Sequence, residues 1–117
     1  MRKLYLLGSL ALIFAACSSE NVEDLSDDCK TREITYQSEM ESLISSNCAT
    51  AGCHVGPNGI GGLDLSTYND VKQIAATGQL LGRVTGSNGN IMPPSGQLGQ
   101  CDIKKITAWV QDGAPNN

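Results

Sequence analysis

This chain of 117 residues has one histidine and only five aromatic residues. One histidine excludes a catalytic cluster or a metal site that needs several histidines from a single chain. Two of the five aromatic residues, Tyr5 and Phe14, lie near the N-terminus, so only three remain for a folded domain. No segment alternates polar and apolar residues for long enough to indicate a strand, and no internal repeat is present. The absences favour an all-α fold whose core lacks aromatic bulk.

The first sixteen residues have the pattern of a secretory signal. Arg2 and Lys3 precede a mostly apolar run over Leu4–Ile13, which is too short to span a membrane, and small residues lead to Cys17. This ending resembles a bacterial lipobox, in which the cysteine is lipidated and becomes the mature N-terminus. We expect an exported protein, lipid-anchored to the outer membrane on the periplasmic side or at the cell surface. The alternative is an ordinary signal peptide with an incidental cysteine.

Residues 17–30 are expected to form an acidic flexible tether, because they are rich in Ser, Glu and Asp and lack apolar periodicity. The acidic stretch either directs export to the outer face of the cell or is a solvated spacer. Without residues 1–16, six basic residues remain against twelve acidic ones, a net charge of −6. Nucleic acid is therefore not an expected partner. Residues 31–117 suffice for one domain.

The most informative segment is Cys48-Ala-Thr-Ala-Gly-Cys53-His54. The common run that ties a haem covalently to a chain is C-x-x-C-H, and here four residues rather than two separate the cysteines. A histidine directly after the second cysteine falls under the iron once two thioethers fix the porphyrin edge. Gly52 can give the longer spacer its backbone freedom. A buried porphyrin would also supply the missing apolar bulk, which makes this segment a candidate haem-attachment site.

Two alternatives use the same residues without haem. Cys48 and Cys53 can form a short-loop disulfide in an exported protein, with His54 as a solvated neighbour. A structural zinc ion usually takes four Cys or His ligands, so these three residues would need Cys29 or Cys101 as a fourth.

Three segments have the apolar spacing of amphipathic helices. The first covers residues 34–47 and leads into Cys48, the second begins at Ser66 or Thr67 and ends near Gly78, and Asp102 is expected to cap the last. Their apolar positions are, in turn, Tyr36, Met40, Leu43 and Ile44; Tyr68, Val71, Ile74 and Ala75; and Ile103, Ile106, Trp109 and Val110. Residues 80–84 can add one short helical turn. Residues 56–62 and 86–99 are predicted loops because of their glycine and proline content.

Helices, attachment run and loops in this order resemble a small class I cytochrome c, and more closely a group of bacterial monohaem cytochrome c lipoproteins. The resemblance covers about Ile34–Asn117 and is carried by four blocks: Cys48-x4-Cys53-His54, Gly61-Gly62-Leu63-Asp64-Leu65-Ser66-Thr67-Tyr68, Ile91-Met92-Pro93-Pro94 and Ile106-Thr-Ala-Trp109-Val110-Gln-Asp-Gly113-Ala114. It implies an all-α fold of about three main helices, with long Gly/Pro loops around one covalent haem c.

The resemblance also implies roles for single residues. Cys48 and Cys53 become the thioether sites, His54 the proximal iron ligand, and Met92 the sulfur ligand on the opposite face of the iron. Met40, the other methionine of the mature chain, lies on an apolar helix face and suits packing better.

Three further residues follow from the same assignment. Cys29 and Cys101 remain once the attachment pair is left free, and in an oxidising compartment they are expected to form a disulfide, one of three pairings that four cysteines allow. Arg83 is either a haem propionate contact or part of a surface salt bridge.

Electron transfer is the leading functional hypothesis: a monomeric carrier with His54 and Met92 on the iron, exchanging electrons with unidentified redox partner proteins. The first alternative is a haem enzyme of peroxidase-like type, in which Asp64 or Glu39 would act as distal acid and base. The second is a haem-free, disulfide-stapled lipoprotein.

Overall fold

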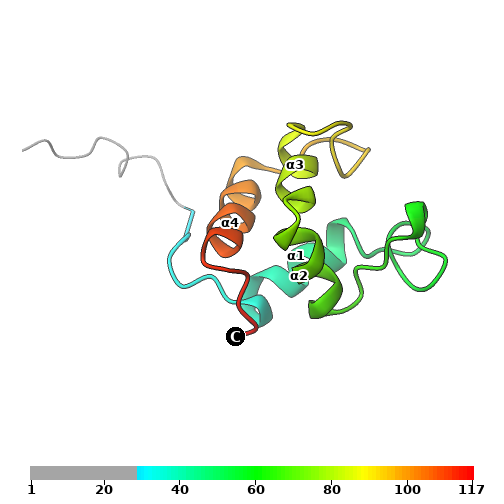
Figure 1. Ribbon diagram of the computed structural model, residues 1–117. Helices are drawn as coiled ribbons and strands as arrows, with labels where there is room; N and C mark the ends of the chain where they lie inside the picture. Colours follow the sequence, from blue (N-terminus) through cyan, green and yellow to red (C-terminus); the bar gives the residue numbers. More distant parts are fainter. Residues whose placement is uncertain (1–28) are drawn as a thin grey trace, which may run out of the picture.

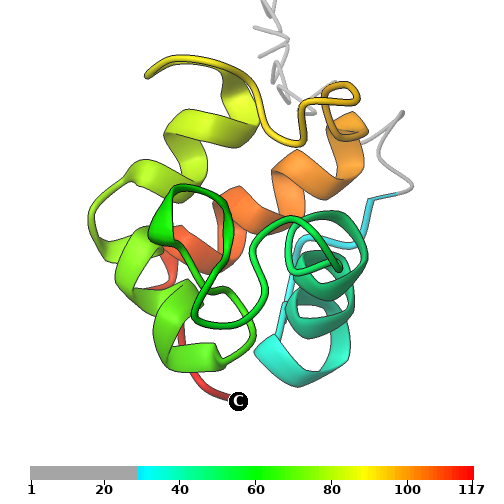
Figure 2. The ribbon, with the colours of Figure 1, turned by 90° about the vertical axis from the view of Figure 1, so that its right-hand side faces the viewer.

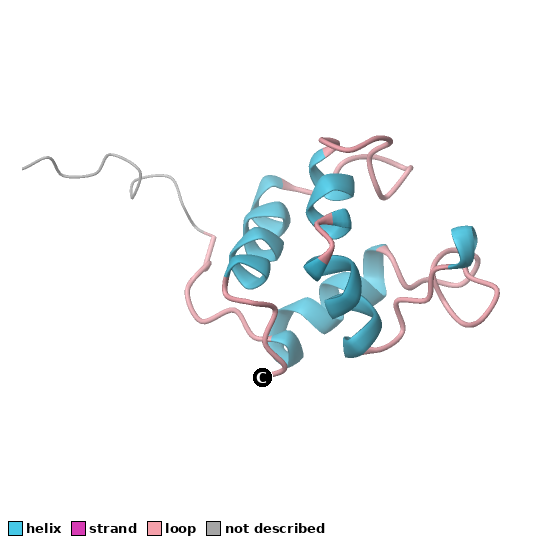
Figure 3. Cartoon of the chain, viewed as in Figure 1, coloured by secondary structure: helices cyan, strands magenta, loops and turns pink. Residues whose placement is uncertain are grey.

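The computed structural model describes residues 29–117, and within that range it is all helix and loop, with no strand (Figures 1 and 3). The expected signal in residues 1–16, Cys17 and nearly all of the tether lie outside the described residues. Four α-helices follow one another as α1 (Glu41–Asn47), α2 (Tyr68–Ala76), α3 (Gln79–Thr85) and α4 (Gln100–Gln111). A π-helical turn, Tyr36–Met40, runs directly into α1, and a short 3₁₀ turn covers Ile60–Gly62. None of the described helices has the length and apolar character needed to cross a membrane.

The first predicted helix is confirmed, although it begins two residues late. Thr35 lies in an extended conformation and its hydroxyl accepts a hydrogen bond from the Ser38 N–H at 3.0 Å, which satisfies one of the free donors at a helix start. The four apolar positions expected on one face are all buried: Tyr36, Met40, Leu43 and Ile44. The helix ends at Asn47, and the N–H of the next residue, Cys48, donates to the Ile44 carbonyl at 2.8 Å.

The second predicted helix is α2, and of its two candidate caps the structure uses Thr67. The Thr67 hydroxyl accepts from the Asp70 N–H at 3.4 Å. Gly78 follows the helix with a φ of +76°, a left-handed conformation that suits glycine because it carries no Cβ. The short helical turn expected over residues 80–84 is confirmed as α3.

The last helix, α4, begins at Gln100, two residues before Asp102. The prediction that Asp102 caps this helix is therefore wrong. Gly99 precedes the first helical residue and makes no side-chain cap, while Asp102 lies within the first turn. A carboxylate there complements the positive end of the helix without replacing a cap. Three of the four predicted apolar positions, Ile103, Ile106 and Trp109, are buried.

The three aromatic residues of the described chain meet in the core. The Tyr36 ring lies 5.0 Å from the Tyr68 ring and 5.8 Å from the Trp109 ring, measured between centroids. Two of the three rings are also hydrogen-bonded to the C-terminal segment: Trp109 Nε1 donates to the Pro115 carbonyl at 3.0 Å, and the Tyr68 hydroxyl donates to the Ala114 carbonyl at 2.8 Å. Trp109 therefore joins α4 to the first helix as a core residue.

The predicted disulfide between Cys29 and Cys101 is present, with the two Cα atoms 5.4 Å apart. It joins the start of the described chain to the first turn of α4 across 72 residues. In the chain-entropy model, closing a loop of this length stabilises the fold by about 4 to 5 kcal/mol. The bond therefore supports a domain whose core is small.

Two long loops leave the helical body. In Figure 1 the loop over residues 48–67 extends to the right of α1, the loop over residues 86–99 lies at the top beside α3, and α4 lies on the left. Figure 2 shows the right-hand side of Figure 1 face on, with the loop that follows Cys48 in front of α4. Of the candidate haem residues, Cys48, Cys53, His54 and Met92 lie on these two loops, and Arg83 lies on α3.

Candidate functional site

The Cys48–His54 segment is a closed loop held by its own backbone. The Cys53 N–H donates to the Thr50 carbonyl at 2.9 Å, and the His54 N–H donates to the Cys48 carbonyl at 3.1 Å. Gly52 has a φ of +80°, so the backbone freedom expected of it is used. The four-residue spacer therefore bulges outward, and Cys48 and His54 stay hydrogen-bonded at its base.

Both cysteines of this loop are free thiols, so the structure contains no Cys48–Cys53 disulfide. Cys48 is buried, with 8% of its surface exposed, while Cys53 is half-buried. Burial raises the pKa of the Cys48 thiol, and the nearby Cys53 raises it further. Cys48 therefore stays protonated at neutral pH, which makes it a slow nucleophile and a poor target for oxidation.

His54 is fixed by its main chain and has an unsatisfied ring nitrogen. Its carbonyl accepts the Leu65 N–H at 2.9 Å, and its own N–H is bonded to Cys48. Nδ1 is buried and has no hydrogen-bond partner, the only such side-chain atom among the described residues. A buried polar atom without a partner costs about 1 to 3 kcal/mol. Such an atom in a native site calls for an explanation, and a bound group that reorients the ring would supply one.

Met92 is half-buried on the second loop, and its N–H donates to the Arg83 carbonyl at 3.0 Å. Met40 is fully buried among the core residues, so the expectation that it packs in the core is confirmed.

The Arg83 side chain is exposed, and its Nη1 donates weakly to the Asn90 carbonyl at 3.5 Å. Among the described residues this contact is with a backbone oxygen and not with a carboxylate, so the surface salt bridge finds no support. The propionate contact remains a prediction.

The zinc alternative lacks its fourth ligand. Cys29 and Cys101 are bonded to each other, so neither is available as a thiolate. Within residues 29–117 no three His, Cys, Asp or Glu side chains are grouped to hold a metal ion. A haem iron ligated by one histidine and one methionine needs no such group.

The two carboxylates considered as distal acid and base, Glu39 and Asp64, are hydrogen-bonded to residues close to them in the sequence. Glu39 accepts hydrogen bonds from the Ser38 hydroxyl and the Thr35 N–H, and in that order these lower its pKa. Asp64 accepts from the Ser66 hydroxyl and from the Ser66 N–H at 2.9 Å, which lowers its pKa in the same way. A general acid in catalysis needs the opposite shift, towards the working pH.

Three apolar side chains to which the sequence analysis gave no role adjoin the candidate residues. Val55, Ile60 and Ile91 are the large hydrophobic residues that the described chain exposes, at 43%, 60% and 39% of their surfaces. Val55 follows His54, Ile91 precedes Met92, and the Ile60 N–H donates to the Cys53 carbonyl at 2.8 Å. Their adjacency to the motif was readable from the sequence, but their exposure was not.

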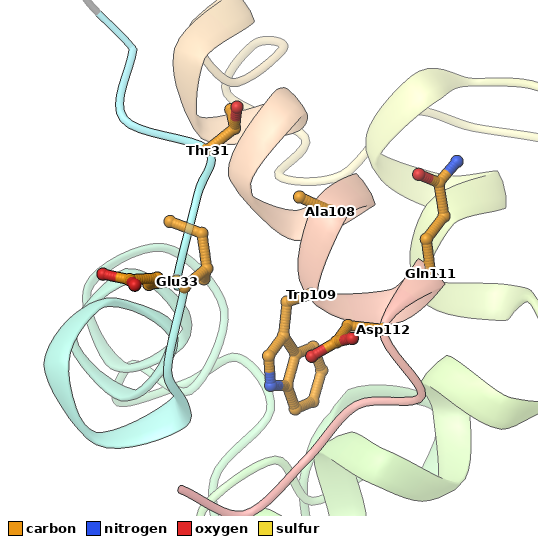
Figure 4. Close-up of a pocket in the computed structure, with 7 residues that line it drawn as sticks. Thr31, Glu33, Ala108, Trp109, Gln111 and Asp112 are labelled. Atoms are coloured by element: carbon orange, nitrogen blue, oxygen red, sulfur yellow. The ribbon is translucent and has the colours of Figure 1, made fainter.

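A hollow of about 530 Å³ lies elsewhere, between the segment around Ile34 and the outer side of α4 (Figure 4). It is lined by Thr31, Glu33, Ile34, Ala108, Trp109, Gln111 and Asp112. None of the candidate haem residues lines it, so it is not part of the candidate site.

No family model, curated protein or solved structure matches this chain.

Proposed function

We propose that this chain is a lipid-anchored c-type cytochrome that carries electrons through one covalently bound haem c. In this proposal Cys48 and Cys53 hold the haem through thioethers, and His54 and Met92 fill the two axial positions of the iron. The helical body would then be a class I cytochrome c-like fold, and the loops over residues 48–67 and 86–99 would present the haem ligands.

One observation carries the proposal: two free thiols and a histidine with an unpartnered buried nitrogen share a single hydrogen-bonded loop. A disulfide would leave no free thiols, and a solvated histidine would leave no buried Nδ1 without a partner. The donor set of two thiols and an imidazole on consecutive turns of one loop fits covalent haem attachment better than either haem-free alternative.

The surroundings fit a large apolar group. Val55, Ile60 and Ile91 expose apolar surface next to the motif, and covering it would gain about 25 cal/mol per Å². The prolines after Met92 stiffen the backbone that would present its sulfur. The haem, when bound, supplies an iron that gains and loses one electron.

The chain's own residues would restrict that chemistry to electron transfer. His54 and Met92 would both ligate the iron and leave no site there for a substrate, and the apolar side chains would limit the access of water. Glu39 and Asp64, whose pKa values are lowered by local hydrogen bonds, do not favour the peroxidase-like alternative.

The proposed location and partners follow from the sequence. A lipid on Cys17 would hold the domain at the outer membrane, on the periplasmic side or at the cell surface. A net charge of −6 for the mature chain suits redox partners with basic or weakly charged docking faces. We propose that the carrier acts as a monomer.

A denaturing gel stained for haem peroxidase activity tests this proposal, because only covalent haem survives denaturation. We expect a stained band for the wild type and for Met92→Ala, and none for Cys48→Ala/Cys53→Ala. The matched control is Cys29→Ala/Cys101→Ala, which removes the same number of cysteines and should still stain. An unstained wild type made with the haem-attachment enzymes would favour the haem-free lipoprotein.

A further inference from the structure

The loop that carries Met92 is fastened to α3 along its length. Besides the bond from the Met92 N–H to the Arg83 carbonyl, the Asn88 N–H donates to the Gly82 carbonyl at 3.3 Å. Gln97 Nε2 donates to the Val84 carbonyl at 3.4 Å. The loop therefore folds back onto the helix from which it came.

The apolar part of this fastening is a contact between Ile91 and the bare backbone of Gly86. Gly86 ends α3 with a φ of +78°. A Cβ placed on Gly86 would lie 2.7 Å from Ile91 Cγ1 and 3.1 Å from Cδ1, closer than side chains normally approach. The Ile91 side chain thus occupies the space that the missing Cβ leaves. One turn earlier, the Asn88 side chain lies in the same way over Gly82.

We propose that Gly86 is a positioning residue for Met92. Ile91 directly precedes Met92 in the chain. The contact of the Ile91 side chain with Gly86 therefore fixes the position of the Met92 backbone. A side chain at position 86 would push Ile91 away and move the Met92 backbone from its bond to Arg83. The consequence for ligation of the iron rests on the proposed function, whereas the positioning of the loop does not.

Gly78, at the other end of α3, is the control position. It has the same left-handed backbone as Gly86 but lacks the contact with a side chain. Its φ is +76°, and a Cβ built there meets nothing within 4 Å. Alanine at either position carries the same conformational strain. Only alanine at position 86 also meets Ile91.

The experiment compares Gly86→Ala with Gly78→Ala in the haem-loaded chain. Both should lower the urea midpoint of unfolding, and Gly86→Ala should lower it further because it also displaces Ile91. In Gly86→Ala alone, we expect the Met92 amide to exchange its hydrogen about tenfold faster, because losing an apolar contact promotes local opening. We also expect this variant alone to lose the methionine-to-iron absorption band of the ferric protein and to have a lower reduction potential.

The Ile91→Ala variant tests the same contact independently, and it can be used even if Gly86→Ala does not fold. It should speed exchange at Met92, and adding Gly86→Ala should cause little further change, because both substitutions break one contact. Equal effects of Gly86→Ala and Gly78→Ala on Met92 exchange, or additive effects of Gly86→Ala and Ile91→Ala, would overturn the proposal. If the protein contains no haem, only the proposed function is wrong. The positioning role of Gly86 can still be tested, because hydrogen exchange at the Met92 amide can be measured without haem.

Discussion

The His54 backbone N–H is bonded to the Cys48 carbonyl oxygen at 3.1 Å, across the whole of the spacer between the cysteines. This bond keeps the histidine beside the first cysteine although the spacer has four residues instead of two. The extra length is absorbed in a bulge in which Ala51 and Gly52 are exposed. The unusual spacing therefore alters the outside of the loop, while its base stays closed.

Gly52→Ala tests the bulge. At a φ of +80°, alanine should destabilise the protein by about 1 to 2 kcal/mol and lower the yield of covalent haem, because both sulfurs must reach the porphyrin from this backbone. Urea unfolding and the haem-to-protein absorbance ratio measure the two effects. Gly61→Ala is the matched control, with a φ of +70° and open space outside the spacer. An equal loss of haem in both variants would show that the bulge has no special role.

Met92→Ala tests the second axial ligand. We expect the ferric spectrum to lose its methionine-to-iron band and the reduction potential to fall, because the thioether ligand raises the potential. The control is Met40→Leu, a core substitution that should cost less than about 1.5 kcal/mol and leave the spectrum unchanged. An unaltered spectrum in Met92→Ala would remove Met92 from the site.

The Cys29–Cys101 disulfide is expected to stabilise the domain without touching the haem. Replacing both cysteines by serine should lower the free energy of unfolding by about 2 to 5 kcal/mol, measured by urea titration. The visible spectrum of the folded variant should match that of the wild type. A changed spectrum would mean that the bond also shapes the candidate site.

Asp64 gives the protein a predictable sensitivity to acid. Hydrogen bonds from Ser66 lower the pKa of Asp64 in the folded state, so the stability they add is present above the ordinary pKa of about 4 and is lost as the pH falls through the lowered value. Asp64→Asn and Ser66→Ala should each flatten the decline of stability between roughly pH 5 and pH 2. Urea midpoints measured across that range provide the check, and slopes equal to the wild-type slope would contradict the assignment.

Methyl NMR tests whether the exposed apolar side chains cover the porphyrin. The Ile60 and Ile91 methyl signals should move between the ferrous and ferric forms, because a paramagnetic iron shifts nearby nuclei strongly. Ile34 lines the hollow beside α4, which none of the candidate haem residues lines, so its methyl signal should move little. Ile60 and Ile91 signals as constant as that of Ile34 would mean that these residues face solvent or a partner.

The helices were predictable because their signals are local. Tyr36, Met40, Leu43 and Ile44 show helical spacing in the sequence itself, and Thr67 is a cap by residue type and position. The prediction that Asp102 caps α4 was wrong because aspartate is suited both to the cap and to the first turn of a helix. Only the backbone conformation distinguishes the two positions. The start of α4 at Gln100 was therefore not readable from residue types alone.

The residues of the candidate site could be predicted from the sequence, but the contacts that hold these residues in place could not. The spacing of Cys48, Cys53 and His54 is a property of the chain, and so is the cysteine count behind the Cys29–Cys101 bond. The buried Nδ1 of His54 and the Ile91 contact on Gly86 depend on how distant segments pack. No periodicity or motif encodes such contacts, so they needed the fold.

Intact mass together with a visible spectrum, recorded on protein made in a host with haem-attachment enzymes, is the most direct test of covalent haem in this chain. The account predicts coloured protein whose mass exceeds that of the mature polypeptide and its lipid by one haem, and a Cys48→Ala/Cys53→Ala variant without the haem mass. Colourless wild-type protein with only the mass of the lipidated polypeptide would contradict it.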